Sequence, residues 1–315
     1  MNDRIYRMAR LFAALAVVML PLSACASPGP APDADAPVAA PIEAVVEFPV
    51  TVTDDTGREV TIETEPARIV SLAPANTEIL AELGLLDRIV GVTSYDDYPA
   101  EVADIEVVGD FVGPNLEAVA AADPDLVVAT GGVQGDVIIQ LEELGATVIA
   151  VDPADLEGLF DSIEMLGAAT GTAQQASDLT VSMRADLEAV SAALGDVEPV
   201  RCFIEIAQNP LFTAGTGTLL NDLINAAGGV NVVTESGWVA YSLEQLVTED
   251  PEVYLATLGS MSDPDDLAGR PGYAELTAVK SGRVHVLDDN LVSRPGPRVV
   301  EGVRAIAEAL HPEAF

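Results

Sequence analysis

The sequence is poor in the residue types on which many catalytic and metal sites depend. Its 315 residues include two cysteines and two histidines. Two cysteines supply no disulfide framework, and Cys202 lies in the apolar run Val200–Ile206, where we expect a buried, inert thiol. Zinc and manganese sites of proteins usually combine several histidines with carboxylates, so two histidines argue against a metal site.

Basic residues are scarce as well, and Lys280 is the only lysine. The chain has 14 Lys and Arg residues against 51 Asp and Glu residues, which gives a formal net charge of −37 at pH 7. A protein that binds nucleic acid needs a basic surface to contact the phosphates. The charge balance therefore excludes nucleic acid as a partner.

The common catalytic motifs are missing too. Residues 214–218 read Ala-Gly-Thr-Gly-Thr and lack the lysine of a phosphate-binding loop. No Gly-x-Ser-x-Gly motif of a serine hydrolase occurs. His285 lies inside a strand pattern and His311 at the end of a helix, so neither is placed for acid–base catalysis. We expect no enzyme activity and no cofactor.

The first apolar run of the chain is too short to cross a membrane. Three arginines at positions 4, 7 and 10 precede the twelve apolar residues Leu11–Leu22, and Leu22-Ser23-Ala24-Cys25 follows. A membrane span needs about 20 apolar residues. The pattern resembles a bacterial lipoprotein signal, which implies that residues 1–24 are removed and that Cys25 is lipidated. An ordinary signal peptide with an incidental cysteine is the alternative.

Residues 25–47 are rich in Pro, Ala and Asp. Such a segment buries too little apolar surface to fold, and its prolines make it a semi-extended tether. The layout is an anchor, a tether and a folded body on the outer face of a membrane.

Two segments of the body have similar sequences. Residues 116–130 read LEAVAAADPDLVVAT and residues 243–257 read LEQLVTEDPEVYLAT. Every matching pair, such as Glu117 and Glu244, is 127 residues apart. This period is far too long for a solenoid. It indicates two similar lobes, each with an acidic residue at the start of an equivalent helix.

The alternation of apolar patterns predicts the fold class. A hairpin over residues 50–62 is followed by alternating strands and helices from residue 68, which is typical of parallel sheets with helices on both faces. Residues 173–194 contain no Pro or Gly and predict a helix about 33 Å long. The alternation then restarts at residue 200. We predict an α/β fold of two Rossmann-like lobes, 48–168 and 197–315, bridged by one long rigid α-helix within 169–196.

Several local features are predicted within the lobes. Asn115 and Ser242 should cap the two repeated helices. A helix is expected over Asn76–Leu83, and the closing helix over Pro297–Leu310, with Pro297 in its first turn. Trp238 is expected in a loop. Ligands of open α/β sheets bind beyond the carboxyl ends of the strands, so two facing lobes predict a cleft between them.

Five motifs carry a resemblance to a known family. They are Ser71–Glu78 (SLAPANTE), Val92–Pro99 (VTSYDDYP), Asn115–Glu117 before Asp123–Asp125, Asn209–Gly215 (NPLFTAG) and Arg294–Arg298 (RPGPR). Over residues 50–312 the chain resembles the substrate-binding lipoproteins of ABC importers for vitamin B12 and iron chelates, which have the class III periplasmic-binding-protein fold. The second and fourth motifs are most similar to the cobalamin branch.

The resemblance implies a role for the repeated glutamates. In this family one surface Glu per lobe docks into arginine-containing pockets of the permease dimer, and Glu117 and Glu244 stand at those positions. A carboxylate in the first turn of a helix is stabilised there, and its pairing with arginine is directional. The alternative is that each Glu only occupies a favourable first-turn position.

The resemblance also implies a ligand cleft. Its contacts would be Tyr95, Phe111, Phe212, Trp238 and Arg294, together with the backbone of Pro74 and Ala75. Large flat side chains suit a corrinoid, and such pockets are mostly apolar. The alternatives are interlobe or core packing for the aromatic residues and pairing with a carboxylate for Arg294. Thr130 stands where relatives can carry another aromatic residue.

The predicted protein is therefore an extracytoplasmic, lipid-anchored monomer that captures a corrinoid and delivers it to an ABC importer. A ferric siderophore or haem is the alternative ligand. Haem would need a His or Tyr axial ligand, and Tyr95 could supply one. An adhesion or signalling module with the same fold is the alternative to transport.

Overall fold

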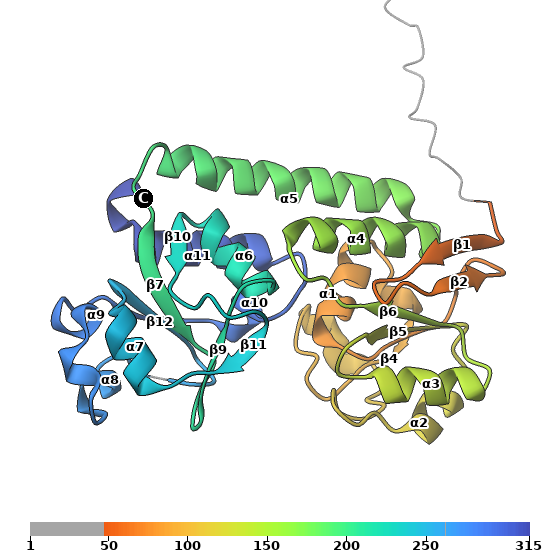
Figure 1. Cartoon of the computed structure of the whole chain (residues 1–315). Coiled ribbons are helices and arrows are strands. Elements are labelled where there is room, and N and C mark those ends of the chain that lie inside the picture. The colour runs from red at the N-terminus through yellow and green to blue at the C-terminus, as the bar shows by residue number, and fades with distance from the viewer. Residues whose placement is uncertain (1–46, 262) are drawn as a thin grey trace, which may run out of the picture. The chain divides into compact units, whose positions relative to one another are not determined.

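The computed structural model describes residues 47–261 and 263–315. The predicted signal, Cys25 and most of the predicted tether lie outside these residues. The described body belongs to one compact unit and is drawn in Figure 1. In this part of the chain, no helix is both long and apolar enough for a membrane crossing.

The body begins with the predicted hairpin. Strands β1 (Val50–Thr53) and β2 (Glu59–Ile62) pair antiparallel. The Asp54 carboxylate closes the turn between them, because it accepts hydrogen bonds from the backbone N–H groups of Thr56 and Arg58, both at 3.0 Å. Asp54 also accepts from the backbone N–H of Ala150 at 3.1 Å, which ties the hairpin to the first sheet.

The first sheet is parallel and has the order β4-β3-β5-β6. Its strands are β3 (Ile69–Ser71), β4 (Ile89–Gly91), β5 (Leu126–Thr130) and β6 (Val148–Val151). Strands β4 and β5 lie on opposite sides of β3. The order of the strands therefore reverses at β3, and such a switch point is where open α/β sheets bind ligands.

The second sheet repeats this topology. Its order is β10-β7-β12-β13, again parallel. The strands are β7 (Val200–Glu205), β10 (Gly229–Asn231), β12 (Val253–Thr257) and β13 (Val284–Leu287). Strand β12 holds the place in this sheet that β5 holds in the first. The duplicated sequence therefore corresponds to a duplicated position in the fold.

The helices cover both sheets, and one of them links the lobes. They are α1 (Pro74–Glu82), α2 (Leu116–Ala121), α3 (Gly135–Glu143), α4 (Leu156–Thr170), α5 (Ala173–Leu194), α6 (Leu219–Ala226), α7 (Leu243–Glu249), α8 (Asp266–Gly269), α9 (Thr277–Lys280), α10 (Asp289–Val292) and α11 (Val299–Leu310). Helix α5 packs against α4 of the first lobe and α11 of the second (Figure 1). The predicted α/β fold with a long bridging helix is confirmed, whereas the exact lobe boundaries stay a prediction.

The two faces of each central strand point into different cores. Leu126 in β5 and Val253 in β12 belong to one large apolar cluster that continues through α4, α5, α6 and α11. Their neighbours Val127 and Tyr254 point the other way, each into a smaller cluster of its own lobe. Each central strand contributes to two clusters, because alternate residues of a strand face opposite sides of the sheet. The large cluster packs both lobes onto the bridging helix.

Three local predictions are wrong. Helix α1 begins at Pro74, two residues before Asn76, because a proline at the first helical position loses no hydrogen bond. Helix α11 begins at Val299, and Pro297 lies in a turn closed by Val299 N–H donating to the Gly296 carbonyl at 3.1 Å. Trp238 does not lie in a loop but is the first residue of a strand.

That strand belongs to a small antiparallel sheet that the sequence did not predict. It has the order β11-β9-β8, with β8 (Ala207–Gln208), β9 (Leu211–Ala214) and β11 (Trp238–Ala240). Trp238 pairs with Ala214, and Ala240 with Phe212. The segment becomes a strand because β9 offers it backbone partners, which its own short sequence does not reveal.

Candidate ligand-binding cleft

The strand ends of the first lobe gather the motif residues at its switch point. Pro74 and Ala75 follow β3, Tyr95 follows β4, and Thr130 is the last residue of β5. These positions lie at the carboxyl ends of adjacent parallel strands. The topology therefore brings together three segments that are separate in sequence.

Two adjoining cavities open beyond these strand ends. The larger has a volume of about 420 Å³ and the smaller about 220 Å³. The larger is lined by Phe111, Thr130, Val133, Asp152, Pro153 and Ala154 from the first lobe and by Gly217, Thr218, Leu219, Leu220, Trp238, Val292, Ser293 and Pro295 from the second. The smaller is lined by Ala73, Pro74, Ala75, Tyr95, Phe111, Thr130, Ser293, Arg294 and Pro295. Because four residues are shared, we treat them as one interlobe cleft.

Aromatic side chains of both lobes line this cleft and remain open to solvent. Tyr95 is 59% exposed and Trp238 is 51% exposed. Phe111 is partly buried and lines both cavities. Phe212, the fourth aromatic residue expected here, lines neither cavity. It is half-buried in β9, on the same face of the small sheet as Trp238.

Arg294 lines the cleft and also pairs with carboxylates of the opposite lobe. Its Nη1 lies 2.6 Å from Asp97 Oδ1 and 3.2 Å from Glu78 Oε1. Arg298 donates to both oxygens of the same Glu78, at 2.6 and 2.9 Å, and lies 4.1 Å from the centre of the Tyr98 ring. Glu78 is 1% exposed. The pairing of Arg294 with carboxylates is therefore present while the side chain also lines the cleft, and its contact with a ligand stays a prediction.

The loop that carries Tyr95 is fixed on both sides. The backbone N–H and the hydroxyl of Thr93 donate to Asp96 Oδ2 at 2.9 and 2.6 Å. Arg294 Nη2 donates to the Tyr95 carbonyl at 3.4 Å. The hydrogen bond from Arg294 holds the pKa of the Asp97 carboxyl below its usual range, while burial raises the pKa of Asp96. The Tyr95 ring is thus presented from an ordered loop.

Gln134 is a positioning residue that the sequence analysis missed. It is fully buried, and its Nε2 donates to the carbonyls of Leu72 at 2.7 Å and Phe111 at 2.6 Å. Its Oε1 accepts from the Thr130 N–H at 2.8 Å. One amide thus joins the ends of two strands to the Phe111 loop. The sequence did not mark it, because two of its three partners, Leu72 and Phe111, are brought to it only by the tertiary structure.

The repeated glutamates stand at equivalent exposed positions outside the cleft. Glu117 lies in the first turn of α2 and Glu244 in the first turn of α7. The predicted caps are present. Asn115 Oδ1 accepts from the N–H of Glu117 at 3.0 Å, and Ser242 Oγ accepts from the N–H of Gln245 at 3.1 Å. Each carboxylate is therefore held on a capped helix.

Other groups considered in the sequence lie away from the cleft lining. Cys202 is buried, which raises the pKa of its thiol to about 12. The His311 ring lies 3.0 Å from the Gly228 carbonyl, and His285 is half-buried in β13. Among the described residues, no three His, Cys, Asp or Glu side chains are grouped as metal ligands would be.

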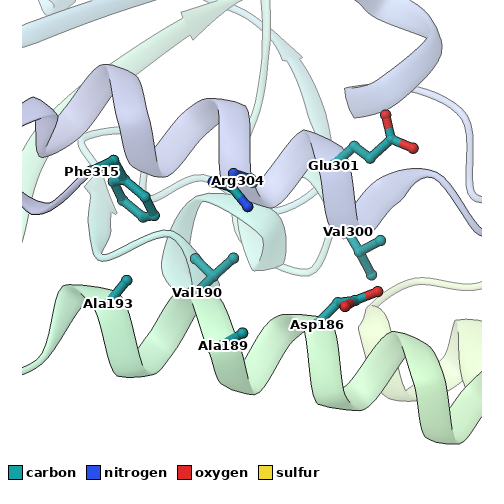
Figure 2. A pocket seen from close by; sticks show the side chains of 8 residues that line it. All are labelled: Asp186, Ala189, Val190, Ala193, Val300, Glu301, Arg304 and Phe315. Carbon is teal, nitrogen blue, oxygen red and sulfur yellow. The ribbon is translucent and has the colours of Figure 1, made fainter.

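A further hollow of about 330 Å³ lies between α5 and α11. Figure 2 shows its side chains: Asp186, Ala189, Val190 and Ala193 from α5, Val300, Glu301 and Arg304 from α11, and Phe315. None of the predicted site residues lies there. The hollow marks the seam along which the bridging helix packs on the second lobe.

Comparison with known proteins identifies the family. The family model described as periplasmic binding protein matches residues 69–291. An uncharacterized ABC transporter substrate-binding lipoprotein of Bacillus subtilis is 37% identical over 316 residues, covering 98% of each chain. A cobalamin-binding protein of Halobacterium salinarum is 31% identical over 315 residues, covering 95% of this chain and 82% of that protein.

A solved structure agrees with these matches. The periplasmic vitamin B12 binding protein of Vibrio cholerae aligns with a TM-score of 0.71 and 27% identity, covering 79% of this chain and 98% of that chain. The recognised family, the fold class and the expectation that the protein is not an enzyme are confirmed. The chain belongs to the periplasmic binding protein family and is a substrate-binding protein of the ABC-transporter type.

Proposed function

We propose that this protein captures a corrinoid, a molecule of the vitamin B12 type, in the interlobe cleft and delivers it to the permease dimer of an ABC importer. In this proposal Cys25 carries the lipid anchor, residues 25–47 form the tether, and the body acts as a monomer outside the membrane. Tyr95, Phe111 and Trp238 contact the ligand, and Glu117 and Glu244 contact the permease.

The observation that carries the choice of ligand is the pair of exposed aromatic side chains that line the cleft from the two lobes. Tyr95 and Trp238 are both more than half exposed, although aromatic rings gain most from burial. A ligand with broad apolar faces would cover both. The cobalamin-binding relative from Halobacterium salinarum supports the same choice.

Isothermal titration with cyanocobalamin tests the proposal. We expect binding at micromolar concentration or tighter, weakened about tenfold or more in Trp238→Ala, because the loss of one stacked aromatic face costs at least about 1.4 kcal/mol. Phe315→Ala is a matched control, since Phe315 is 45% exposed but lies outside the cleft. Absence of binding to the wild-type protein would exclude a corrinoid of this kind.

An iron chelate is the second candidate, because Tyr95 is exposed and phenol oxygen can ligate iron. Titration with haem or a ferric hydroxamate, followed by absorption spectroscopy, distinguishes it. A charge-transfer band that disappears in Tyr95→Phe would favour the iron chelate over the corrinoid.

The docking role of the glutamates has its own test. We expect Glu117→Ala with Glu244→Ala to abolish uptake in whole cells and to leave ligand affinity unchanged, because both carboxylates lie outside the cleft. Glu188→Ala is the control, since Glu188 is an exposed residue of α5. Normal uptake by the double variant would refute docking through these residues.

A further inference from the structure

Asp152 is a charged side chain of the ligand cleft that lies outside the five sequence motifs. It follows strand β6 directly and lines the larger cavity. Among the residues that line the two cavities, Asp152 and Arg294 are the charged ones. Arg294 is already paired with Glu78 and Asp97. The charge that the cleft can offer to a ligand is therefore negative and belongs to Asp152.

The Asp152 carboxylate is held in place by the loop that follows β5. Its Oδ2 accepts from the Gly132 N–H at 2.7 Å, and the Asp152 N–H donates to Asp55 Oδ2 at 2.7 Å. A Cβ atom on Gly132 would lie 3.0 Å from Asp152 Oδ2, so the glycine permits this close approach. Because the carboxylate is ordered before binding, little conformational freedom is lost when a ligand contacts it.

The second oxygen of this carboxylate is free. Within residues 47–261 and 263–315, Asp152 Oδ1 accepts no hydrogen bond, and Asp152 forms no ion pair. Its neighbour Asp55 is also a carboxylate, which adds negative charge rather than balancing it. An ionised carboxylate can only accept hydrogen bonds. A ligand that covered Asp152 without donating one would leave a buried, unpaired charge, which is unfavourable.

The candidate ligands differ in the polar groups at their edges. The ring of a corrinoid carries carboxamides, whose N–H groups donate hydrogen bonds. Haem and ferric carboxylate chelates carry carboxylates, which cannot donate when ionised and which repel a like charge. A site that is built for a hydrogen-bond donor rejects analogues that lack the donor. Asp152 therefore favours an amide edge over an acidic one.

We propose that Asp152 is a specificity-determining residue of the cleft, whose free Oδ1 accepts an N–H from a peripheral carboxamide of the ligand and whose charge excludes chelates with carboxylates at that edge. The inference rests on the proposed capture of a corrinoid and adds the residue that separates a corrinoid from acidic iron chelates. Asparagine cannot replace Asp152, because its single oxygen is needed by the Gly132 N–H, which leaves an N–H donor in place of Oδ1.

Titration calorimetry with two corrinoids that share one ring tests this role. The edge of dicyanocobyric acid consists mostly of carboxamides, whereas dicyanocobyrinic acid carries carboxylates at those positions. We expect the wild-type protein to bind the amide form at least about tenfold more tightly, because repulsion replaces a hydrogen bond to a charged acceptor. Asp152→Asn should bind the amide form about tenfold more weakly than wild type and should bind the two forms within about twofold of each other.

Asp136→Asn is the matched control, since Asp136 is an exposed aspartate of α3 that lines neither cavity. It removes the same charge from the same lobe and should leave both affinities unchanged. Titration in about 0.5 M NaCl screens the large negative charge of the rest of the protein. Circular dichroism and the thermal midpoint establish that each variant is folded.

The outcomes separate this inference from the function on which it rests. If the wild-type protein binds both forms equally, or if Asp152→Asn weakens both by the same factor, the role of Asp152 in specificity is overturned and capture of a corrinoid stands. A preference for the amide form that persists in Asp152→Asn overturns it as well. If the wild-type protein binds neither form and does not bind cyanocobalamin, the proposed function is overturned together with the inference.

Discussion

Arg294 lines the cleft and also pairs with carboxylates of the opposite lobe. Its guanidinium has five N–H donors; Nη1 contacts Asp97 and Glu78, and Nη2 contacts the Tyr95 carbonyl. Contact with two carboxylates fixes a long, flexible side chain before any ligand arrives. This ordering lowers the conformational cost of binding.

The Asp97 contact predicts a dependence of stability on pH. Because its pKa is lowered in the folded state, the stabilisation is fully present above the unfolded value of about 3.9 and is lost as the pH falls through the lower folded value. We expect urea unfolding to show wild type more stable than Asp97→Asn near pH 6, with the difference vanishing toward pH 2.5.

The control for these unfolding measurements is the Asp87→Asn variant, because Asp87 is an exposed aspartate on the same lobe. It should show no comparable difference from wild type across the range. A gap between wild type and Asp97→Asn that stays constant down to pH 2.5 would contradict an electrostatic role for the Arg294 contact.

At the scale of elements, the repeated segment forms the same unit in each lobe. Asp123 and Asp250 follow the repeated helices with φ of 50° and 45°, and they are the non-glycine residues with positive φ in the described chain. Each precedes a proline, which disfavours the helical conformation, and aspartate tolerates the left-handed region. The Asp-Pro pair thus ends the helix and directs the chain into the next strand.

Asp123 and Asp250 should contribute differently to the free energy of unfolding. Asp250 also accepts hydrogen bonds from the N–H and the hydroxyl of Thr277, both at 2.7 Å. We expect Asp250→Ala to lower the free energy of unfolding by about 2–3 kcal/mol, since it adds backbone strain to the loss of these bonds. Asp123→Ala, which has the strain alone, should cost about 1 kcal/mol. Equal losses in denaturant titrations would show that the Thr277 bonds contribute little.

At the scale of the whole molecule, a buried carboxylate of the first lobe pairs with two arginines of the second lobe. Glu78 of α1 receives both Arg294 and Arg298, which lie more than 200 residues further along the chain. Helix α5 joins the lobes through the shared apolar cluster. The cleft therefore lies between two lobes that are connected by an apolar seam and by a polar clamp.

Removing the charge of Glu78 should destabilise the folded protein. We expect Glu78→Gln to lower the free energy of unfolding by about 3 kcal/mol, because two partly buried guanidinium groups lose their shared partner, and to weaken ligand binding as Arg294 is released. The matched control is Glu157→Gln, whose pair with Arg184 is exposed and should contribute less than about 1 kcal/mol. Urea unfolding and titration calorimetry measure both effects, and losses of equal size would rule out a special role for Glu78.

The elements that sequence predicted well are those with local signals. The interlobe helix Ala173–Leu194 has the predicted bounds, and the repeated helix Leu243–Glu249 begins after its predicted cap, Ser242, because apolar spacing and caps act within a few residues. Strands β10 and β11 were missed, since each is short and forms only by pairing with a strand from elsewhere. In the site, the predicted residues Tyr95, Trp238 and Arg294 line the cleft, whereas Phe212 does not.

The sequence alone determined the α/β class, the duplicated helix-to-strand segment and the bridging helix, because each follows from the spacing of apolar residues along the chain or from the repetition of one segment. Only the tertiary structure decided which residues meet. Gln134 joining two strand ends to Phe111, Glu78 clamping two arginines and Gly132 holding the Asp152 carboxylate all depend on contacts between distant segments. Such contacts are set by the packing of the sheets and of helix α5, and no local pattern encodes them.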